Sequence, residues 1–200
     1  KSLKTESISF HASYRYFRLT CSDEKWDLME NDFKKSIEIC KEHNGEFLVL
    51  HTNEGLPGEV MDKGILEKRI QKLIKLGKEK EVKVVIENVG IGKNILYNQE
   101  EYIELIKKYN FDSLIDIGHA IANNWDLDKV ITELKENIIA YHFHNNDGEK
   151  DLHKSIYDGK ADYERIISLV KENTPEANIV LEYSAATPKR EILETLEKLS

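Results

Sequence analysis

The sequence contains very little cysteine. Two residues, Cys21 and Cys40, are the only cysteines in 200 residues, and they form no C-x-x-C pair. A scaffold built on disulfide bonds is therefore excluded. The same scarcity is typical of a reducing compartment, so we expect a cytoplasmic protein.

Long apolar runs are also missing. No stretch of the sequence approaches the roughly 18 apolar residues that a membrane-spanning helix requires. The first residues, Lys1 to Thr5, lack the apolar core of a signal peptide. We therefore expect no membrane partner.

Positive charge is in deficit. Lys and Arg number 29 against 37 Asp and Glu, which gives a net charge of −8. This balance argues against broad, nonspecific binding to nucleic acid, which depends on a basic surface. An enzyme that grips DNA through a local patch is not excluded, and a cleft rich in carboxylates would suit a divalent metal ion.

Linkers rich in Pro, Gly or Ser are absent as well, and the sequence shows no internal repeat. The length is sufficient for one hydrophobic core. We therefore predict one domain over residues 1–200.

Short apolar segments alternate with longer helical patterns along the whole chain. Apolar residues recur at helical spacing between the segments, for example at Phe33, Ile37 and Cys40, where Asn44 and Gly45 then end the predicted helix. Continuous apolar strands are typical of a parallel sheet that is covered on both faces, and strand followed by helix, six times, predicts a parallel α/β fold. The six predicted strands are Ser7–His11, Phe47–His51, Lys83–Glu87, Asp112–Asp116, Ile138–His142 and Ile179–Glu182.

Every predicted strand ends in an ionisable residue. Function in a parallel α/β fold lies at the carboxyl ends of the strands. Six such groups on one rim would repel or desolvate one another unless they bind something, and carboxylates and neutral imidazoles are ligands of metal ions. We therefore predict a shared metal or catalytic site made by His11, His51, Glu87, Asp116, His142 and Glu182.

Further polar groups follow the strands closely. The interpretation of each remains open between function and structure: Asn88 as a turn residue or a substrate contact, and His144 as a substrate contact or a support of its loop. A structural role is favoured for His43, near a helix C-terminus, and for the aromatic residues Tyr14, Tyr16, Phe17, Trp26 and Trp125. The additional candidates for the site are His119, Asp151 and His153.

Seven short motifs in this order resemble the xylose-isomerase-like barrels, a superfamily that includes sugar isomerases and epimerases and endonuclease IV. The resemblance covers nearly the whole chain and implies a (β/α)8 TIM barrel. Only six β/α units are present, equivalent to strands 3–8, so the first two units are expected to be missing and the domain to be incomplete at its N-terminus. The motifs are H-A-S-Y (His11–Tyr14), L-H-T-N (Leu50–Asn53), I-E-N (Ile86–Asn88), D-I-G-H-A (Asp116–Ala120), H-x-H-N (His142–Asn145), D-L-H (Asp151–His153) and L-E-Y (Leu181–Tyr183).

The epimerase branch implies one divalent ion, Mn, Mg, Co or Zn, and a sugar, sugar phosphate or polyol as substrate. Glu87 and Glu182 would move a proton on the carbon next to a carbonyl, through a metal-stabilised enediolate. His119 would contact the substrate, with Asn88 and His144 as further contacts. The implied ligands of the ion are Glu87, Asp116, His142 and Glu182.

The endonuclease IV branch implies three zinc ions and cleavage of DNA at abasic sites. All nine of its ligand positions have a candidate here, and imidazole-rich sites suit zinc. Short loops and the net charge of −8 favour a small substrate instead. The nine residues are His11, His51, Glu87, Asp116, His119, His142, Asp151, His153 and Glu182.

The sequence also departs from the family in places. Asn145 stands where an Asp often follows the H-x-H, and the stretch 147–155 has no Arg, which puts a ketohexose substrate in doubt. The glycine turn expected after D-x-H keeps only Gly159. We predict a metal-dependent sugar isomerase or epimerase, with a zinc nuclease and a non-catalytic metal-binding barrel fragment as alternatives, and we leave a homo-oligomer open.

Overall fold

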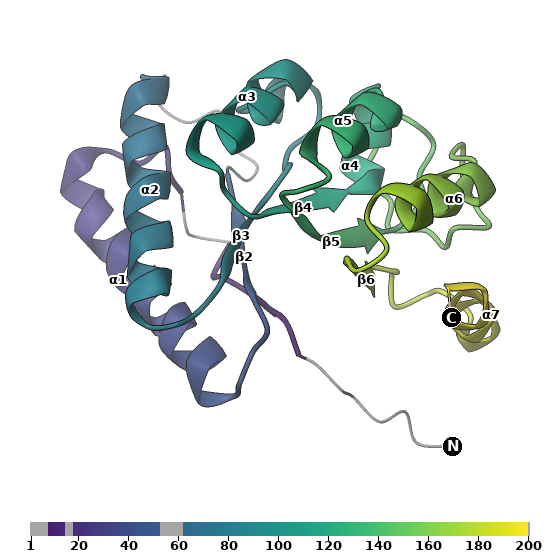
Figure 1. Cartoon of the computed structure of the whole chain (residues 1–200), viewed down its shortest axis with the longest axis horizontal. Helices are drawn as coiled ribbons and strands as arrows, with labels where there is room; N and C mark the ends of the chain where they lie inside the picture. Colours follow the sequence, from purple (N-terminus) through teal and green to yellow (C-terminus); the bar gives the residue numbers. More distant parts are fainter. Residues whose placement is uncertain (1–7, 15–17, 53–61, 200) are drawn as a thin grey trace. The chain divides into compact units, whose positions relative to one another are not determined.

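A computed structural model describes residues 8–14, 18–52 and 62–199. The chain divides into two compact units, Lys1–Glu87 and Asn88–Ser200. The first unit carries β1 to β3 with helices α1 and α2, and the second carries β4 to β6 with helices α3 to α7 (Figure 1).

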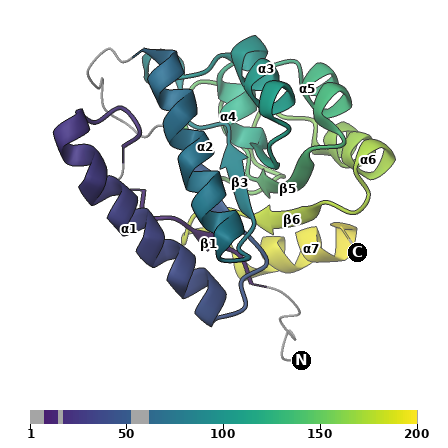
Figure 2. The same cartoon turned by 60° about the vertical axis from the view of Figure 1, so that its left-hand side comes forward.

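The first unit has a parallel sheet in the order β1-β2-β3. The register sets Phe10 opposite Leu48 and His51 opposite Glu87. Helices α1 and α2 follow β1 and β2 and lie side by side (Figure 2). The elements are β1 (Phe10–His11), α1 (Asp23–Glu42), β2 (Leu48–His51), α2 (Lys63–Glu79) and β3 (Val84–Glu87).

The predicted apolar stripe of α1 is confirmed, because Phe33, Ile37 and Cys40 are buried. Asn44 ends the helix in the left-handed region, with φ 52°. The following Gly45 is required by close packing, since a Cβ there would lie 2.5 Å from the Cys40 Sγ.

A buried arginine, which the sequence analysis did not single out, joins the two helices of this unit. Arg69 of α2 is 5% exposed and donates to the carbonyl oxygen of Cys21 at 2.7 Å. It also donates to Asp23 at 2.7 Å and lies 4.6 Å over the ring of Trp26. A buried guanidinium is tolerated only when its donors are used, so Arg69 fixes the start of α1 against α2.

The second unit has a parallel sheet with β5 between β4 and β6. Register places Asp116 opposite His142. Helix α5 packs between α3 and α6, as both views show (Figures 1 and 2). The elements are η1 (Gly92–Asn94), α3 (Gln99–Tyr109), β4 (Ser113–Asp116), α4 (Ile117–Ala122), α5 (Leu127–Leu134), β5 (Ile138–Phe143), α6 (Tyr163–Asn173), β6 (Asn178–Leu181) and α7 (Lys189–Leu199).

All six predicted strands are present, with small shifts at their ends. β5 extends one residue past His142, and β6 stops one residue before Glu182. The predicted first strand is shorter, because among the described residues only Phe10–His11 pair. β6 is half-buried along its length rather than fully covered, since among the described residues it pairs with β5 alone. Among the described residues, no helix has the length and apolar character to cross a membrane.

Candidate metal centre

Three predicted residues of the first unit gather at the carboxyl ends of its strands. The His51 Nε2 lies 2.8 Å from the Glu87 Oε2, and the rings of His11 and His51 are 5.0 Å apart between their centres. One nitrogen or oxygen atom from each of the three residues lies within 4.8 Å of the others. Tyr14, predicted as a packing residue, has its ring 5.4 Å from that of His51. The other aromatic residues of its cluster, Tyr16 and Phe17, lie outside the described residues.

In the second unit, the carboxylates of Asp116 and Glu182 both approach the imidazole of His142. The His142 Nδ1 lies 3.8 Å from the Asp116 Oδ2 and 3.4 Å from the Glu182 Oε2. Asp116 and His142 are buried, whereas the Glu182 side chain is 24% exposed. Although Glu182 follows β6, its N–H donates to the Phe143 carbonyl at 3.1 Å, so it stays aligned with β5. Two of the four ligands that the resemblance implies for one ion, Asp116 and Glu182, therefore each lie close to a third, His142.

Asp116 is held from two sides. The Asn88 amide donates to the Asp116 carbonyl oxygen at 3.0 Å, and the Asp116 N–H donates to the Asn88 Oδ1 at 2.7 Å. The Asp116 carboxylate accepts the N–H of His119 at 2.6 Å, which caps α4. Asn88 thus holds the backbone of Asp116, a predicted ligand, in place; the contact of Asn88 with a substrate stays a prediction.

His119 and His153 are oriented in the same manner. The His119 Nδ1 lies 3.0 Å from the carbonyl oxygen of Asn88, and the His153 Nδ1 lies 2.9 Å from that of Glu182. A carbonyl only accepts, so each Nδ1 carries the hydrogen. Both Nε2 atoms then face Asp151, at 3.4 Å for His119 and 3.1 Å for His153. This is how imidazoles are prepared for a metal ion.

The charges in this group favour a cation beside Asp151. Burial raises the pKa of Asp151, but hydrogen bonds and charges from His119 and His153 outweigh it and hold the pKa far below its ordinary value. The hydrogen bond to Asp151 raises the pKa of His153 to about 9, against the opposing effect of burial. A positive charge, whether a proton or a metal ion, is therefore stabilised at this position.

The backbone of His153 is in the left-handed region, with φ 48°. A non-glycine residue there is uncommon and costs energy, so surrounding contacts must hold it. The His153 carbonyl accepts from the N–H of Ser184 at 2.7 Å, and Lys154 bridges to Asn145. The strained residue is one of the nine predicted ligands.

The loop between β5 and α6 depends on two asparagines. Asn145 was noted in the sequence only as a departure from the family pattern, and Asn146 was not noted. Asn145 accepts from the Ala161 N–H at 3.1 Å, and Asn146 donates to the Gly118 carbonyl at 2.8 Å. Gly159 is needed because a Cβ there would lie 2.3 Å from the Asn145 Cγ. The adjacent Asn145-Asn146 pair after a strand was the available signal, since asparagines satisfy turn backbones.

The donor set fits a divalent metal ion. Carboxylates and imidazoles are ligands of zinc and related ions at about 2.0–2.2 Å, so two ligand atoms of one ion lie roughly 3–3.5 Å apart. The pairs that involve His142, Asp151 and Glu182 have separations of 3.1 to 3.8 Å. Two sets within the second unit each have one ligand atom per residue within 4.8 Å of the others, namely Asp116, His119 and His144, and His144, His153 and Glu182.

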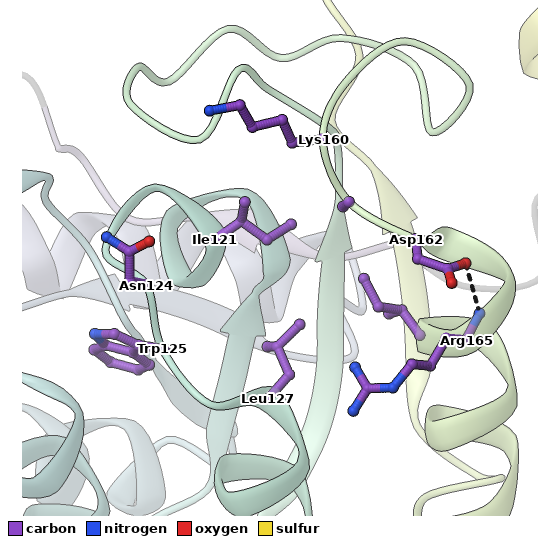
Figure 3. Close-up of a pocket in the computed structure, with 9 residues that line it drawn as sticks. Ile121, Asn124, Trp125, Leu127, Lys160, Asp162 and Arg165 are labelled. Atoms are coloured by element: carbon purple, nitrogen blue, oxygen red, sulfur yellow. Dashed lines mark hydrogen bonds between the residues drawn. The ribbon is translucent and has the colours of Figure 1, made fainter.

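A hollow of about 380 Å³ lies elsewhere on the second unit (Figure 3). Trp125 and Leu127 line it together with Lys160 and Arg165, and none of the predicted ligands does. Trp125 also packs against Tyr102 with ring centres 5.6 Å apart, in line with its predicted packing role. The nine predicted metal ligands therefore do not line this hollow.

Residues 2–200 match the family described as xylose isomerase-like TIM barrels. The chain belongs to this family. The predicted fold class is thereby confirmed, and the family match spans both compact units. The chain supplies six β/α units of that α/β fold.

Solved structures share the fold at low sequence identity. A D-tagatose 3-epimerase-like protein matches with a TM-score of 0.78 and 21% identity, over 96% of this chain and 75% of that chain. A 3-keto-D-glucoside 4-epimerase from E. coli matches with a TM-score of 0.75 and 12% identity, over 96% and 78%. The IolI protein, solved with a zinc atom, matches with a TM-score of 0.75 and 18% identity, over 96% and 74%.

A curated relative is an uncharacterized protein from Methanocaldococcus jannaschii. It is 24% identical over 152 residues, which are 73% of this chain and 50% of that protein. The match thus spans half the length of the relative.

Proposed function

We propose that this chain works as a divalent-metal-dependent isomerase or epimerase of a sugar or polyol. The observation that carries the proposal is the approach of two carboxylates to His142 within the second unit: Asp116 lies 3.8 Å and Glu182 3.4 Å from the His142 Nδ1. The names of similar structures support it, since they include a D-tagatose 3-epimerase-like protein and a 3-keto-D-glucoside 4-epimerase.

Glu87 is the fourth ligand in this proposal. It is the last residue of β3 and directly precedes Asn88, the residue that clamps Asp116. Its assignment to the same ion rests on the family resemblance of the I-E-N motif.

When bound, the ion would polarise the carbonyl and hydroxyl oxygens of the sugar. The protein's own part is proton transfer. We assign to Glu87 and Glu182 the removal and the return of a proton on the carbon next to the carbonyl. In this scheme His119 contacts the substrate. Its Nδ1 is held by the carbonyl oxygen of Asn88, so the contact would be made by its Nε2, which lies 3.4 Å from Asp151.

The first experiment measures metal content in protein purified without added metal, followed by a screen of ketoses, aldoses and polyols for epimer formation. Glu182→Gln is the test variant, and Glu104→Gln, an exposed carboxylate on α3 of the same unit, is the matched control. We expect about one ion per chain in the wild type and control, and at least about tenfold weaker binding in Glu182→Gln. Unchanged metal binding in Glu182→Gln would reject the ligand set.

A zinc phosphodiesterase is the second candidate. Two observations favour it: the Nε2 atoms of His119 and His153 both face Asp151, and His11, His51 and Glu87 form their own group. About three zinc ions per chain, with cleavage of abasic DNA, would replace the isomerase proposal. A bound ion without turnover of sugars or DNA would support the non-catalytic alternative.

A further inference from the structure

His144 occupies a place that differs from that of a substrate contact. It follows His142 by two residues, directly after β5, and its side chain is fully buried. Its Nε2 lies 3.1 Å from both carboxylate oxygens of Asp116. A group with no exposed surface acts on a substrate only through its neighbours.

The hydrogen-bond partners of this imidazole determine which of its two nitrogens carries the hydrogen. An ionised carboxylate only accepts, so the His144 Nε2 carries the hydrogen and donates it to Asp116. The His144 Nδ1 has no hydrogen-bond partner among the described residues. A buried N–H without an acceptor is rare, which again places the hydrogen on Nε2.

The ring is also held rigidly. It stacks on the ring of His153 with centres 4.3 Å apart and planes 16° from parallel. On another side it packs against Gly118, where a Cβ would come within 1.9 Å of the His144 Cε1. The hydroxyl of Tyr163 donates to the His144 carbonyl at 2.6 Å. His144 therefore has one orientation available.

We propose that His144 is a positioning residue for Asp116. The carboxylate already accepts the His119 N–H through Oδ1. The second donor, His144, fixes the carboxylate plane so that Oδ2 faces His142. This inference rests on the proposed function, in which Asp116 binds a metal ion. Hydrogen-bond donors to a carboxylate that binds a metal commonly control metal affinity.

Two variants of similar volume isolate the hydrogen bond. His144→Gln keeps an N–H donor near the position of Nε2, and His144→Leu removes it, while both lose the stacking on His153. Cobalt(II) affinity, measured by competition with a chelator, and the visible absorption spectrum of the bound ion are the readouts. We expect His144→Leu to bind cobalt about 10–100-fold more weakly with an altered spectrum, and His144→Gln to stay within about threefold of wild type.

Wild-type affinity in His144→Leu would overturn the proposal. Equal losses in the two variants would overturn it as well, because they would show that the imidazole acts as a ligand or by packing alone. Far-UV circular dichroism of both metal-free variants checks that each folds.

Nitrogen-15 NMR of the histidine rings tests the hydrogen bond without any metal. We expect the Nε2–H tautomer for His144, and a shift of that resonance in Asp116→Asn. The Nδ1–H tautomer would overturn the proposal. If the wild type binds no cobalt, the proposed function fails, and this NMR result then decides the role of His144 by itself.

Discussion

At the scale of single residues, three histidines near Asp116 and Asp151 are each held in one orientation by a hydrogen bond. For His144 the partner is the Asp116 carboxylate. His119 and His153 donate from Nδ1 to backbone carbonyls, which leaves Nε2 directed at Asp151. Such anchoring fixes the tautomer before an ion arrives and lowers the entropy cost of binding. The arrangement predicts that single ligand losses are severe for metal binding and mild for folding.

Glu87→Gln is expected to abolish the activity and to leave folding intact. The substitution removes the charge and the proton-transfer capacity of a buried side chain but keeps its size, and the Glu87 side chain is 1% exposed. Activity on the identified substrate and the thermal midpoint of the metal-free protein are the measurements. Full activity in Glu87→Gln would reject both enzyme candidates.

His153→Asn tests whether more than one ion binds. Asparagine tolerates the left-handed backbone of position 153, so the variant separates loss of the imidazole from backbone strain. A multi-zinc centre predicts the loss of about one zinc ion per chain, by elemental analysis, from both His153→Asn and His11→Asn. His43→Asn, outside the site, serves as the control. Unchanged zinc content in both test variants would leave a single-ion centre.

At the scale of elements, helices α1 and α2 are joined by charge as well as by apolar packing. Glu30 of α1 is buried, and it pairs with Lys34 of the same helix at 2.7 Å and with Lys72 of α2. Burial raises the pKa of Glu30, but the hydrogen bonds and charges of the two lysines prevail and bring it below 4.5. The carboxylate is thus more stable in the folded protein than in the unfolded chain.

Stability should therefore depend on pH through Glu30. Because the pKa of Glu30 is lower in the folded protein than in the unfolded chain, the ionised carboxylate stabilises the fold above pH 4.5. This stabilisation is lost as the pH falls through the pKa of the folded state. We expect Glu30→Gln to cost about 1 kcal/mol at pH 7 and less than that near pH 3. Urea unfolding at both pH values measures the difference, with the exposed Glu38→Gln as control. An equal cost at both values would contradict the electrostatic explanation.

At the scale of the whole molecule, metal binding should stabilise the fold. The ligands come from segments far apart in sequence, so the unfolded chain has no preformed site. An ion present at 100 times its dissociation constant adds about 2.7 kcal/mol to the free energy of unfolding. For a chain of this size we expect a rise of about 5–10 °C in the thermal midpoint.

Differential scanning calorimetry with added zinc or manganese, and after chelation, measures this rise. Glu182→Gln should show little of it, and Glu104→Gln should show all of it. A rise of the same size in Glu182→Gln would indicate that the ion binds elsewhere.

The sequence by itself determined the parallel α/β fold and the strand ends, because continuous apolar strands and helical stripes are local patterns. Polar residues at those ends, such as Glu87 and Asp116, could be recognised from their place after an apolar segment. The role of Arg69 as a link between α1 and α2 could not be predicted from the sequence, since nothing near position 69 indicates which carbonyl oxygens its guanidinium donates to.

Only the tertiary structure decided how the ligand group is held. Asn88 and His144 each reach Asp116 across 28 residues, and the anchors of His119 and His153 lie 31 and 29 residues away. The tautomer of an imidazole and the plane of a carboxylate depend on these distant donors and acceptors. Spacing along the chain carries no record of them, because they arise only when segments distant in sequence fold against one another.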